Sequence, residues 1–343
     1  MGRVTLQDVA EHAGVSMKTV SNVVAGYRHV SPRMRERVQA AIDELGYRPN
    51  RSGRSLATGR SSMLALAFPD LRRPYFAELA HVFARVADAR GYRLLLAETG
   101  GTADGERAVL HDRESGTIDG IVIHPQALSA AELDELSDGT PIVFLGEDPQ
   151  PIGADQVAVD NVAAAETAVD HLLRSGRRRI GFLGHEVGTL SRTSALRIRG
   201  YRNALERAGL AFDPALLVPR TDGDAPGAEE ALHAALGRGV APDALLCRDD
   251  LAAIGALRAL RRHGLEVPAD VAVVGWDAID LGASTAPSLT SVAPDTRTLA
   301  ERALDLLLER LDGLTEPGRH VTVGHGLVFR ESAPEVPGSA ISA

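Results

Sequence analysis

Hydrophobic positions change their spacing along the chain at about residue 63. After this point, short apolar runs alternate with longer amphipathic stretches. The apolar runs predict buried strands at 63–68, 92–99, 120–125, 141–147, 156–160, 179–184, 244–248 and 271–276. The amphipathic stretches predict helices near 74–90, 104–115, 130–138, 162–175, 194–209, 226–238 and 250–263. This alternation predicts an α/β fold with parallel sheets that carry helices on both faces.

The strands and helices of this body fall into two sets. The first set ends with the run at 141–147, and the second begins with the run at 156–160. Two sets predict two lobes, because each sheet needs a helical layer of its own. Ligands of such sheets bind outside the carboxyl ends of the strands, so the expected ligand site is a cleft between the lobes.

The head of the chain shows helical spacing instead. Apolar residues at i, i+3, i+4 and i+7 predict a helix over 5–13, and Gly14 permits a left-handed turn because it has no Cβ. A short helix over 17–25 and a longer one over 32–45 follow, each preceded by a serine that can cap it. A helix, a tight turn, a short helix and a supporting helix make up an all-α helix-turn-helix headpiece.

The exposed face of the second predicted helix favours DNA over other partners of a three-helix module. This face is small and polar, so it fits the major groove. Lys18 can donate to guanine, Asn22 can pair with adenine, and Met17 offers an apolar contact to a thymine methyl group. Hydroxyls at helix starts and edges typically reach phosphates, and here they belong to Thr5, Ser16, Thr19, Ser21 and Ser31.

The charge of the chain is unevenly distributed. Residues 1–60 contain ten basic and five acidic residues, a net charge of +5 within a chain of net charge −9, which leaves −14 for the rest. A basic head on an acidic body indicates that the head meets a polyanion, although chance clustering gives the same count. Lys18 is the only lysine among the 37 basic residues.

Composition and motifs narrow the class of protein further. The 343 residues suit a small domain plus a large one, no apolar run approaches the ~20 residues of a membrane span, and the first residues lack a secretory h-region. We therefore expect a cytoplasmic protein without a membrane partner. Cys247 is the only cysteine, so it is expected to be a small core residue. We find no P-loop, HExxH or GxSxG motif and no metal-ligand spacing, so no enzyme, cofactor or metal is expected.

The head closely resembles the headpiece of the lactose/galactose repressor family of bacterial transcription regulators. The matching runs are VTLQDVAEHAGVSMKTVSNVV and HVSPRMRERVQAAIDELGYRPNRSGRSLATGR. The resemblance implies that the segment after the third helix folds into a hinge helix on the operator, with Leu56 wedged into the minor groove. The DNA contacts that it implies, together with those above, are Thr5, Ser16, Met17, Lys18, Thr19, Ser21, Asn22, His29, Ser31, Tyr47, Asn50, Arg54, Leu56 and Ala57.

The resemblance continues to about Arg330 and implies a two-lobed, periplasmic-binding-protein-like core. Its chain is expected to cross between the lobes near residues 160, 290 and 320. The tail is rich in Pro, Ser, Gly and Ala and has no heptads, so it is expected to be disordered. The expected divisions are a headpiece over 1–47, a hinge over 48–61, a core over 62–331 and a tail over 332–343.

Matching the family's cleft motifs places candidate effector contacts at the ends of predicted strands. Carboxylates and an arginine make directional bonds to vicinal hydroxyls, and Trp276 can stack on a sugar ring, so a sugar or sugar derivative is the expected ligand. Taken singly, each candidate fits a cap or a core position better than a ligand contact, but jointly they fall at predicted strand ends, where a ligand is expected. The candidates are Asp70, Tyr75, Phe76, His124, Arg197, Arg248, Asp249, Trp276 and Asp277.

Two departures from the family affect the expected ligand. Arg248 stands where the family often has asparagine, and Gly146 stands where it often has aspartate. The gain of a cation and the loss of an acid favour an anionic alternative, such as a uronic or phosphorylated sugar.

The resemblance also implies a homodimer that places two headpieces on a pseudo-palindromic, double-stranded operator. Effector binding then changes the closure of the lobes and the spacing of the hinges, and the sequence does not decide whether it induces or corepresses. Repression is the commoner outcome in the family. Two alternatives stay open: a sugar-binding protein without a regulatory role, and an enzyme with a regulator head. The complete head argues against the first and the lack of a catalytic motif against the second.

Overall fold

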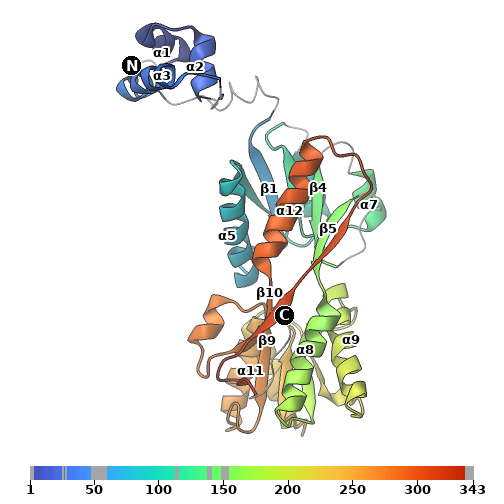
Figure 1. Ribbon diagram of the computed structural model, residues 1–343. Helices are drawn as coiled ribbons and strands as arrows, with labels where there is room; N and C mark the ends of the chain where they lie inside the picture. Colours follow the sequence, from blue (N-terminus) through green and yellow to red (C-terminus); the bar gives the residue numbers. More distant parts are fainter. Residues whose placement is uncertain are drawn as a thin grey trace. The chain divides into compact units, whose positions relative to one another are not determined.

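The computed structural model describes residues 4–24, 27, 29–47, 60–112, 116–136, 141–147 and 154–336 (Figure 1). The chain divides into two compact units, Met1–Ser62 and Met63–Ala343. Each unit has a hydrophobic core of its own. The expected hinge contacts lie outside the described residues; they are Asn50, Arg54, Leu56 and Ala57.

The described part of the first unit has three helices at the predicted places, α1 (Leu6–Ala13), α2 (Met17–Val24) and α3 (Pro32–Leu45). A capping box begins α1: the Thr5 hydroxyl accepts from the Asp8 amide at 3.3 Å, and the Asp8 carboxylate accepts from the Thr5 amide at 2.7 Å. Gly14 follows α1 with φ +60°, where a Cβ would lie 2.5 Å from Nη2 of Arg37. The three helices enclose a small core that includes the fully buried Val20.

The second unit contains two six-stranded sheets, one in each of two lobes (Figure 1). Lobe 1 has the strand order β11-β5-β4-β3-β1-β2, and all its neighbouring strands are parallel. Its strands are β1 (Met63–Phe68), β2 (Arg93–Glu98), β3 (Gly120–Ile123), β4 (Ile142–Leu145), β5 (Asp155–Val159) and β11 (His320–Val323). Its helices are α5 (Pro74–Ala89), α6 (Ala103–Asp112), α7 (Ala130–Glu135) and α12 (Thr296–Leu311).

Lobe 2 has the strand order β12-β10-β9-β8-β6-β7. Its neighbouring strands are parallel except for β10 and β12, which run antiparallel. Its strands are β6 (Ile180–Glu186), β7 (Leu217–Arg220), β8 (Ala244–Cys247), β9 (Ala272–Trp276), β10 (Thr290–Pro294) and β12 (His325–Val328). Its helices are α8 (Asn161–Arg174), α9 (Arg192–Arg207), α10 (Ala225–Gly237) and α11 (Asp250–Arg262). The predicted α/β fold with parallel sheets is confirmed.

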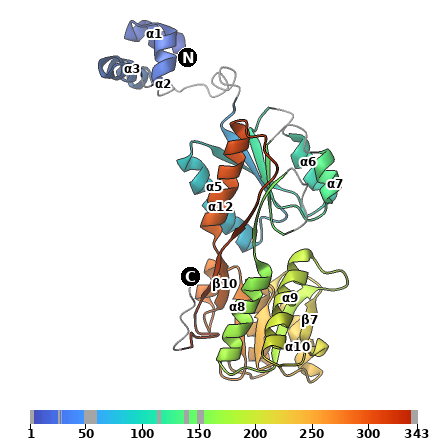
Figure 2. The same ribbon diagram turned by 45° about the vertical axis from the view of Figure 1, so that its right-hand side comes forward.

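Side chains of the strands alternate between two helical layers, because successive residues of a strand point to opposite faces. In β8, Ala244 and Leu246 pack with α8 and α9, whereas Leu245 and Cys247 pack with α10 and α11. Figure 2 shows α8 and α9 together on one side of this sheet. Cys247 is fully buried, which confirms the prediction of a small core residue.

The chain passes between the lobes three times. It does so between β5 and α8, between β10 and α12, and between β11 and β12. Figure 1 shows these segments running through the waist of the second unit. The crossings lie close to the positions expected from the sequence, and they leave the carboxyl ends of both sheets facing one cleft.

Ordered structure extends further toward the carboxyl end than expected. The Ser332 hydroxyl donates to the Val273 carbonyl at 2.6 Å and accepts from the Thr290 amide at 2.8 Å. Ala333 is 4% exposed in the core of lobe 2. The expected disordered tail over 332–343 is therefore wrong at its start, because these first two residues supply hydrogen bonds and apolar surface to β9 and β10.

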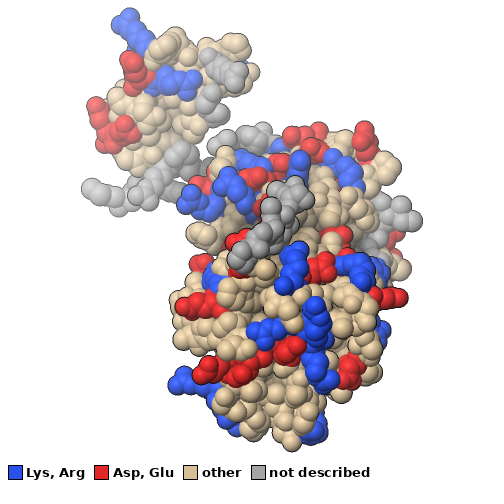
Figure 3. All heavy atoms as spheres, turned by 60° about the horizontal axis from the view of Figure 1, so that its bottom comes forward, with Lys and Arg blue, Asp and Glu red and all other residues tan. Residues whose placement is uncertain are grey.

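Within the described part of the chain, no helix is long and apolar enough to cross a membrane. Figure 3 shows one face of the molecule with its charged side chains coloured. On this face of the second unit, acidic and basic side chains lie next to one another rather than gathered by sign. Such a face differs from the broad basic surface that marks polyanion binding.

Packing of α8 against α9 depends on Gly200. A Cβ at this position would lie 2.3 Å from the Val162 carbonyl oxygen and 2.9 Å from Cβ of Ala165. We expect Gly200→Ala to force the helices apart and to lower the free energy of unfolding by about 1–3 kcal/mol. Urea unfolding followed by circular dichroism measures this change.

The control for this variant is Gly237→Ala at the end of α10. Nothing lies within 4 Å of a Cβ at Gly237, and alanine favours a helix over glycine by up to about 1 kcal/mol. We expect this variant to be as stable as the parent protein or slightly more stable. Equal stability of the Gly200 and Gly237 variants would contradict this account of the helix contact.

Candidate functional site

The exposed face of α2 carries the side chains that the sequence assigned to base contacts. Lys18 and Ser21 are exposed, Met17 is 54% exposed, and Asn22 is half-buried at the edge of the face. Val20, on the opposite side of α2, is buried in the core of the unit. The helix therefore holds its polar face outward on an apolar support, as a groove-reading helix requires.

Hydroxyl residues begin the helices of this unit. The Ser16 hydroxyl accepts from the Thr19 amide at 3.2 Å, and the Ser31 hydroxyl accepts from the Met34 amide at 3.4 Å. Thr5 does the same for α1. Each hydroxyl lies beside the free amides of a helix N-terminus, which is a favourable place for a phosphate oxygen.

Tyr47 has a different place from the other expected DNA contacts. Its side chain is 8% exposed and packs in the core of the first unit. Gly46, with φ +62°, turns the chain back after α3, and the Tyr47 amide then donates to the Ile42 carbonyl at 3.0 Å. The expected role of Tyr47 is corrected to core packing, whereas His29 is exposed.

A cavity of about 770 Å³ lies between the lobes of the second unit. This volume is within the range of small-molecule sites, about 300–1,000 Å³. Lobe 2 contributes the loops that follow β6, β7 and β8, so the cavity lies at the carboxyl ends of these strands. Lobe 1 contributes Arg73, Gly101, His124 and Gln126.

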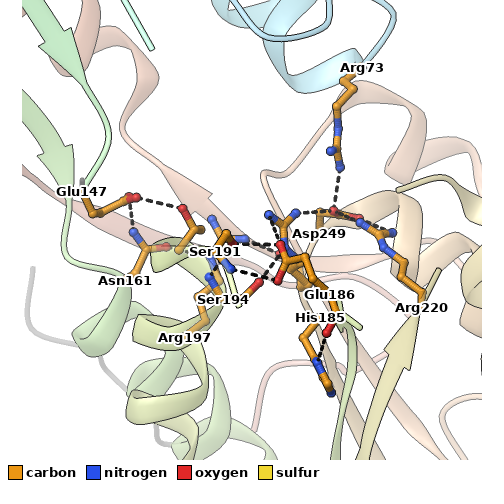
Figure 4. Close-up of polar contacts among 12 residues, drawn as sticks. Arg73, Glu147, Asn161, His185, Glu186, Ser191, Ser194, Arg197, Arg220 and Asp249 are labelled. Atoms are coloured by element: carbon orange, nitrogen blue, oxygen red, sulfur yellow. Dashed lines mark hydrogen bonds and ion pairs between the residues drawn. The ribbon is translucent and has the colours of Figure 1, made fainter. Parts of the chain in front are cut away.

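Asp249 lies behind one wall of this cavity and binds three of the arginines that line it (Figure 4). It caps α11 by accepting from the Ala252 amide at 2.9 Å. Its Oδ2 lies 2.5 Å from Nη2 of Arg220 and 3.1 Å from Nη1 of Arg248, and Arg73 of lobe 1 reaches the same oxygen at 2.8 Å. Burial alone would raise the pKa of Asp249, but the three arginines hold it well below its usual value.

A second set of polar contacts lies beside this wall (Figure 4). Nε of Arg197 donates to Oδ1 of Asn161 at 2.7 Å, and the Asn161 amide donates to the Glu147 carboxylate of lobe 1. The guanidinium of Arg197 also lies 3.9 Å from the centre of the Trp276 ring. Burial lowers the pKa of Arg197 to about 10 and raises that of Asp277 well above its usual value.

The headpiece and the two-lobed unit each match a known family. Residues 5–50 match the model of bacterial regulatory proteins of the lacI family, and residues 169–333 match that of a periplasmic binding protein-like domain. The HTH-type transcriptional regulator CelR of Thermobifida fusca is 35% identical over 347 residues, which cover 96% of this chain and 98% of that protein. The chain belongs to the LacI family.

Solved structures of LacI-family proteins have the same fold. The Lac repressor dimer bound to operator and the anti-inducer ONPF matches with a TM-score of 0.82 at 28% identity, over 97% of this chain and 100% of that one. The complex of transcriptional regulator CelR with cellobiose matches with a TM-score of 0.71 at 30% identity, over 96% of this chain and 100% of that one. The recognition made from the sequence is confirmed.

In this LacI-family chain, the expected effector contacts are divided among different places. His124 and Arg248 line the cavity between the lobes. Asp249 binds Arg248 and also two other arginines of the cavity lining, Arg73 and Arg220. Tyr75 and Asp277 line a second cavity of about 590 Å³, and together with Asp249 they also line a small pocket beside Arg73. The structure therefore brings together some of the predicted residues and separates others.

Three expected contacts have other roles in the structure. Trp276 is fully buried in the core of lobe 2, so it does not present its ring to a ligand. Phe76 is 7% exposed and stacks on Phe68 with 5.0 Å between ring centres. Asp70 binds Arg72 of its own loop, with 3.0 Å between Oδ1 and Nε. These residues were chosen by matching family motifs near predicted strand ends, but a place near a strand end does not fix whether a side chain faces the cleft or the core.

Sequence reasoning missed several residues of the cavity wall. Arg73 comes directly before α5, and Arg220 ends β7, a strand that was not predicted. Ser191 caps α9 and donates to the Glu186 carboxylate at 2.8 Å. Ser194 accepts from Nε of Arg248 at 2.8 Å. A serine before a helix was a usable signal for Ser191, whereas no pattern pointed to Arg220.

Asp250 is a buried carboxyl group next to Asp249. Its Oδ1 accepts from the Ser291 hydroxyl at 2.7 Å, and its Oδ2 accepts from the Ile279 amide at 2.8 Å. Burial raises the pKa of Asp250 from 3.8 to about 7, against the lowering effect of these hydrogen bonds. The folded protein therefore holds this proton more tightly than the unfolded chain does.

We expect Asp250 to make stability fall as the pH rises. Its contribution is fully present below the unfolded pKa of 3.8 and is lost as the pH rises through the folded value of about 7. Asp250→Asn resembles the protonated form, so its stability should fall less than that of the parent between about pH 5 and pH 8. Denaturant unfolding at a series of pH values measures this.

Asp104→Asn is the control, because Asp104 is a 99% exposed side chain on α6. This variant should keep the pH profile of the parent protein. If the Asp250 variant also kept that profile, the buried carboxyl would not be the titrating group.

Proposed function

We propose that this LacI-family chain is a transcription repressor that binds a pseudo-palindromic operator as a homodimer under the control of a sugar or sugar derivative. The observation that carries this proposal is the combination, in one chain, of an exposed polar face on α2 and a ligand-sized cavity between two lobes. Two solved structures with the same fold are the Lac repressor dimer bound to an operator and the complex of CelR with cellobiose.

The DNA part of the proposal rests on the residues of α2. Lys18, Ser21 and Met17 are exposed together on one face of a short helix, and buried valines hold that helix in place. A single headpiece covers only one half-site, so a dimer and a two-fold symmetric operator follow from the geometry of such motifs. Phosphate contacts by the hydroxyls at the helix starts would fix the orientation of the headpiece.

The control part rests on contacts that span the cleft. Arg73 of lobe 1 binds Asp249 of lobe 2, and Nε of Arg192 donates to the Glu147 carbonyl at 2.8 Å. A ligand that competes for these groups changes the relative stability of open and closed lobes. If the lobe angle sets the spacing of two hinges in a dimer, ligand binding and operator binding are coupled.

Binding-site selection from fragmented genomic DNA tests this function directly. We expect the full-length protein to enrich one sequence with two half-sites related by two-fold symmetry, and the midpoint of operator binding to shift when the effector is added. A weaker affinity with effector identifies an inducer, and a stronger affinity identifies a corepressor. Failure to enrich any sequence would contradict the proposed function and revive the alternative of a sugar-binding protein without a regulatory role.

Lys18 gives a residue-level test of the same proposal. Lys18→Ala should relax the preference at one base pair of each half-site, at a cost of about 1–3 kcal/mol against the preferred base. Gel shifts with a set of operators that differ at single positions measure this cost.

The matched control is Gln39→Ala, which removes an exposed side chain of α3 that bonds Asp43 at 3.0 Å. The Gln39 variant should keep both the affinity and the preference of the parent protein. If Lys18→Ala weakened binding to every operator equally, Lys18 would be a phosphate contact rather than a base contact.

A further inference from the structure

The cavity between the lobes carries more basic than acidic side chains. Four guanidinium groups line it, from Arg73, Arg192, Arg220 and Arg248. Two carboxylates also belong to its described lining, and one of them, Glu186, already binds Nη2 of Arg248 at 3.2 Å. A neutral sugar does not require such a concentration of guanidinium groups, because hydroxyl and amide groups are sufficient to bind hydroxyls.

Asp249 offsets only part of this positive charge. Its single carboxylate is shared by Arg73, Arg220 and Arg248, and Glu186 also pairs with Arg248, so three guanidinium groups face two carboxylates. Arg73 uses Nη2 for this contact and Arg220 uses Nη1 and Nη2, and among the described residues Nε of neither group has a hydrogen-bond partner. Like charges repel strongly where water is partly excluded, so an added anion stabilises this cluster.

Backbone amides add positive potential at the same place. The 16-residue helix α9 begins at the cavity, where Ser191, Arg192 and Thr193 form part of the lining. The loop 221–223, which leads into α10, also lines the cavity. Helix N-termini carry partial positive charge, which favours an anion, and at α9 the Glu186 carboxylate already accepts from the Ser191 amide and hydroxyl. The arginines and the helix starts therefore act in the same direction.

Gly146 supplies no side chain at a position of lobe 1 where the family often has an acidic one. It has φ +97°, a backbone conformation that residues with a Cβ rarely adopt. A Cβ there would also lie 3.1 Å from Nε2 of His124, which lines the cavity. The aspartate that the family often has at this position is thus disfavoured by the local backbone of this chain.

We propose that the ligand of this cavity is a polyol that carries an anionic group, either a carboxylate or a phosphate. The anionic group binds among Arg73, Arg192 and Arg220 at the start of α9, and the hydroxyls of the ligand bind Gln126 of lobe 1 and Thr221 of lobe 2. This inference rests on the proposed function, since it takes the cavity as the effector site. Such a ligand replaces Asp249 as a partner of Arg73 and so acts on the contact that joins the lobes.

Calorimetric titration of the full-length protein at constant ionic strength tests this proposal. The probes are glucose, gluconate, glucose 6-phosphate and inorganic phosphate. We expect gluconate or glucose 6-phosphate to bind at least tenfold more tightly than glucose, and the better of the two identifies the anionic group. Both should bind more tightly than inorganic phosphate, because the hydroxyls add contacts.

Two variants assign this preference to the cavity. Arg192→Gln and Arg73→Gln should each lower the affinity for the anionic probe about tenfold and leave that for glucose unchanged, as expected for the loss of a charge-assisted contact. Arg192 is exposed, so its variant keeps the test valid if Arg73→Gln does not fold. Arg258→Gln removes a 69% exposed guanidinium on α11 and should leave all four affinities unchanged.

Three results would overturn the proposal. The first is equal or tighter binding of glucose, the second is no binding of either anionic polyol, and the third is an equal effect of Arg258→Gln and Arg192→Gln. Operator selection by the same protein separates this inference from the proposed function. If a symmetric operator is selected while the anionic probes fail, only the nature of the ligand is wrong.

Discussion

The carboxylate of Asp249 joins three parts of the second unit that the sequence keeps far apart. It caps α11, binds arginines at the ends of β7 and β8, and receives Arg73 from the start of α5 in the other lobe. A buried carboxylate costs several kcal/mol unless it is paired and hydrogen-bonded, and a buried arginine behaves in the same way. Each partner in this cluster therefore depends on the others, and the geometry of the cleft depends on the cluster.

The parallel sheets explain why this cluster forms at the cleft. In both lobes, helices that follow strands begin at the carboxyl edge of the sheet, so their positive ends gather at one place. Arg73 lies at such a helix start, where a cation is unfavourable unless a carboxylate faces it. Asp249 supplies that carboxylate from lobe 2. The same concentration of positive potential makes the cleft a suitable place for an anionic ligand.

Most of the fold followed from patterns that are local in sequence. Period-3.6 spacing located the described headpiece helices, and continuous apolar runs located most strands, because strands of a parallel sheet are buried on both faces. β7, β10, β11 and β12 were missed: β7, β11 and β12 have only four residues each, and β10 is rich in small and polar residues. The ordered residues Ser332 and Ala333 were also missed, since their burial depends on hydrogen bonds to strands about 40 to 60 residues earlier.

The candidate site was less predictable than the fold. Of the residues that family motifs pointed to, His124 and Arg248 line the cavity between the lobes and Asp249 lies beside its wall, while their role as effector contacts stays a prediction. The motifs failed for Trp276, because the ring turns into the core and Arg197 covers it. The direction in which a side chain points at a strand end depends on tertiary packing. The charge balance of the cavity wall depends on residues brought together from three or more elements. Neither property is visible in the spacing of residues along one chain.

Reciprocal linkage between the ligand and the operator tests the central claim most directly. The affinity of the full-length protein for its selected operator is measured with and without saturating ligand, and the affinity for the ligand is measured with and without saturating operator. If the two sites are coupled, the ligand changes the operator affinity by the same factor as the operator changes the ligand affinity, and this factor differs from one. A ligand affinity that is unchanged by the operator would contradict the account, because ligand in the cleft would then have no effect on DNA binding.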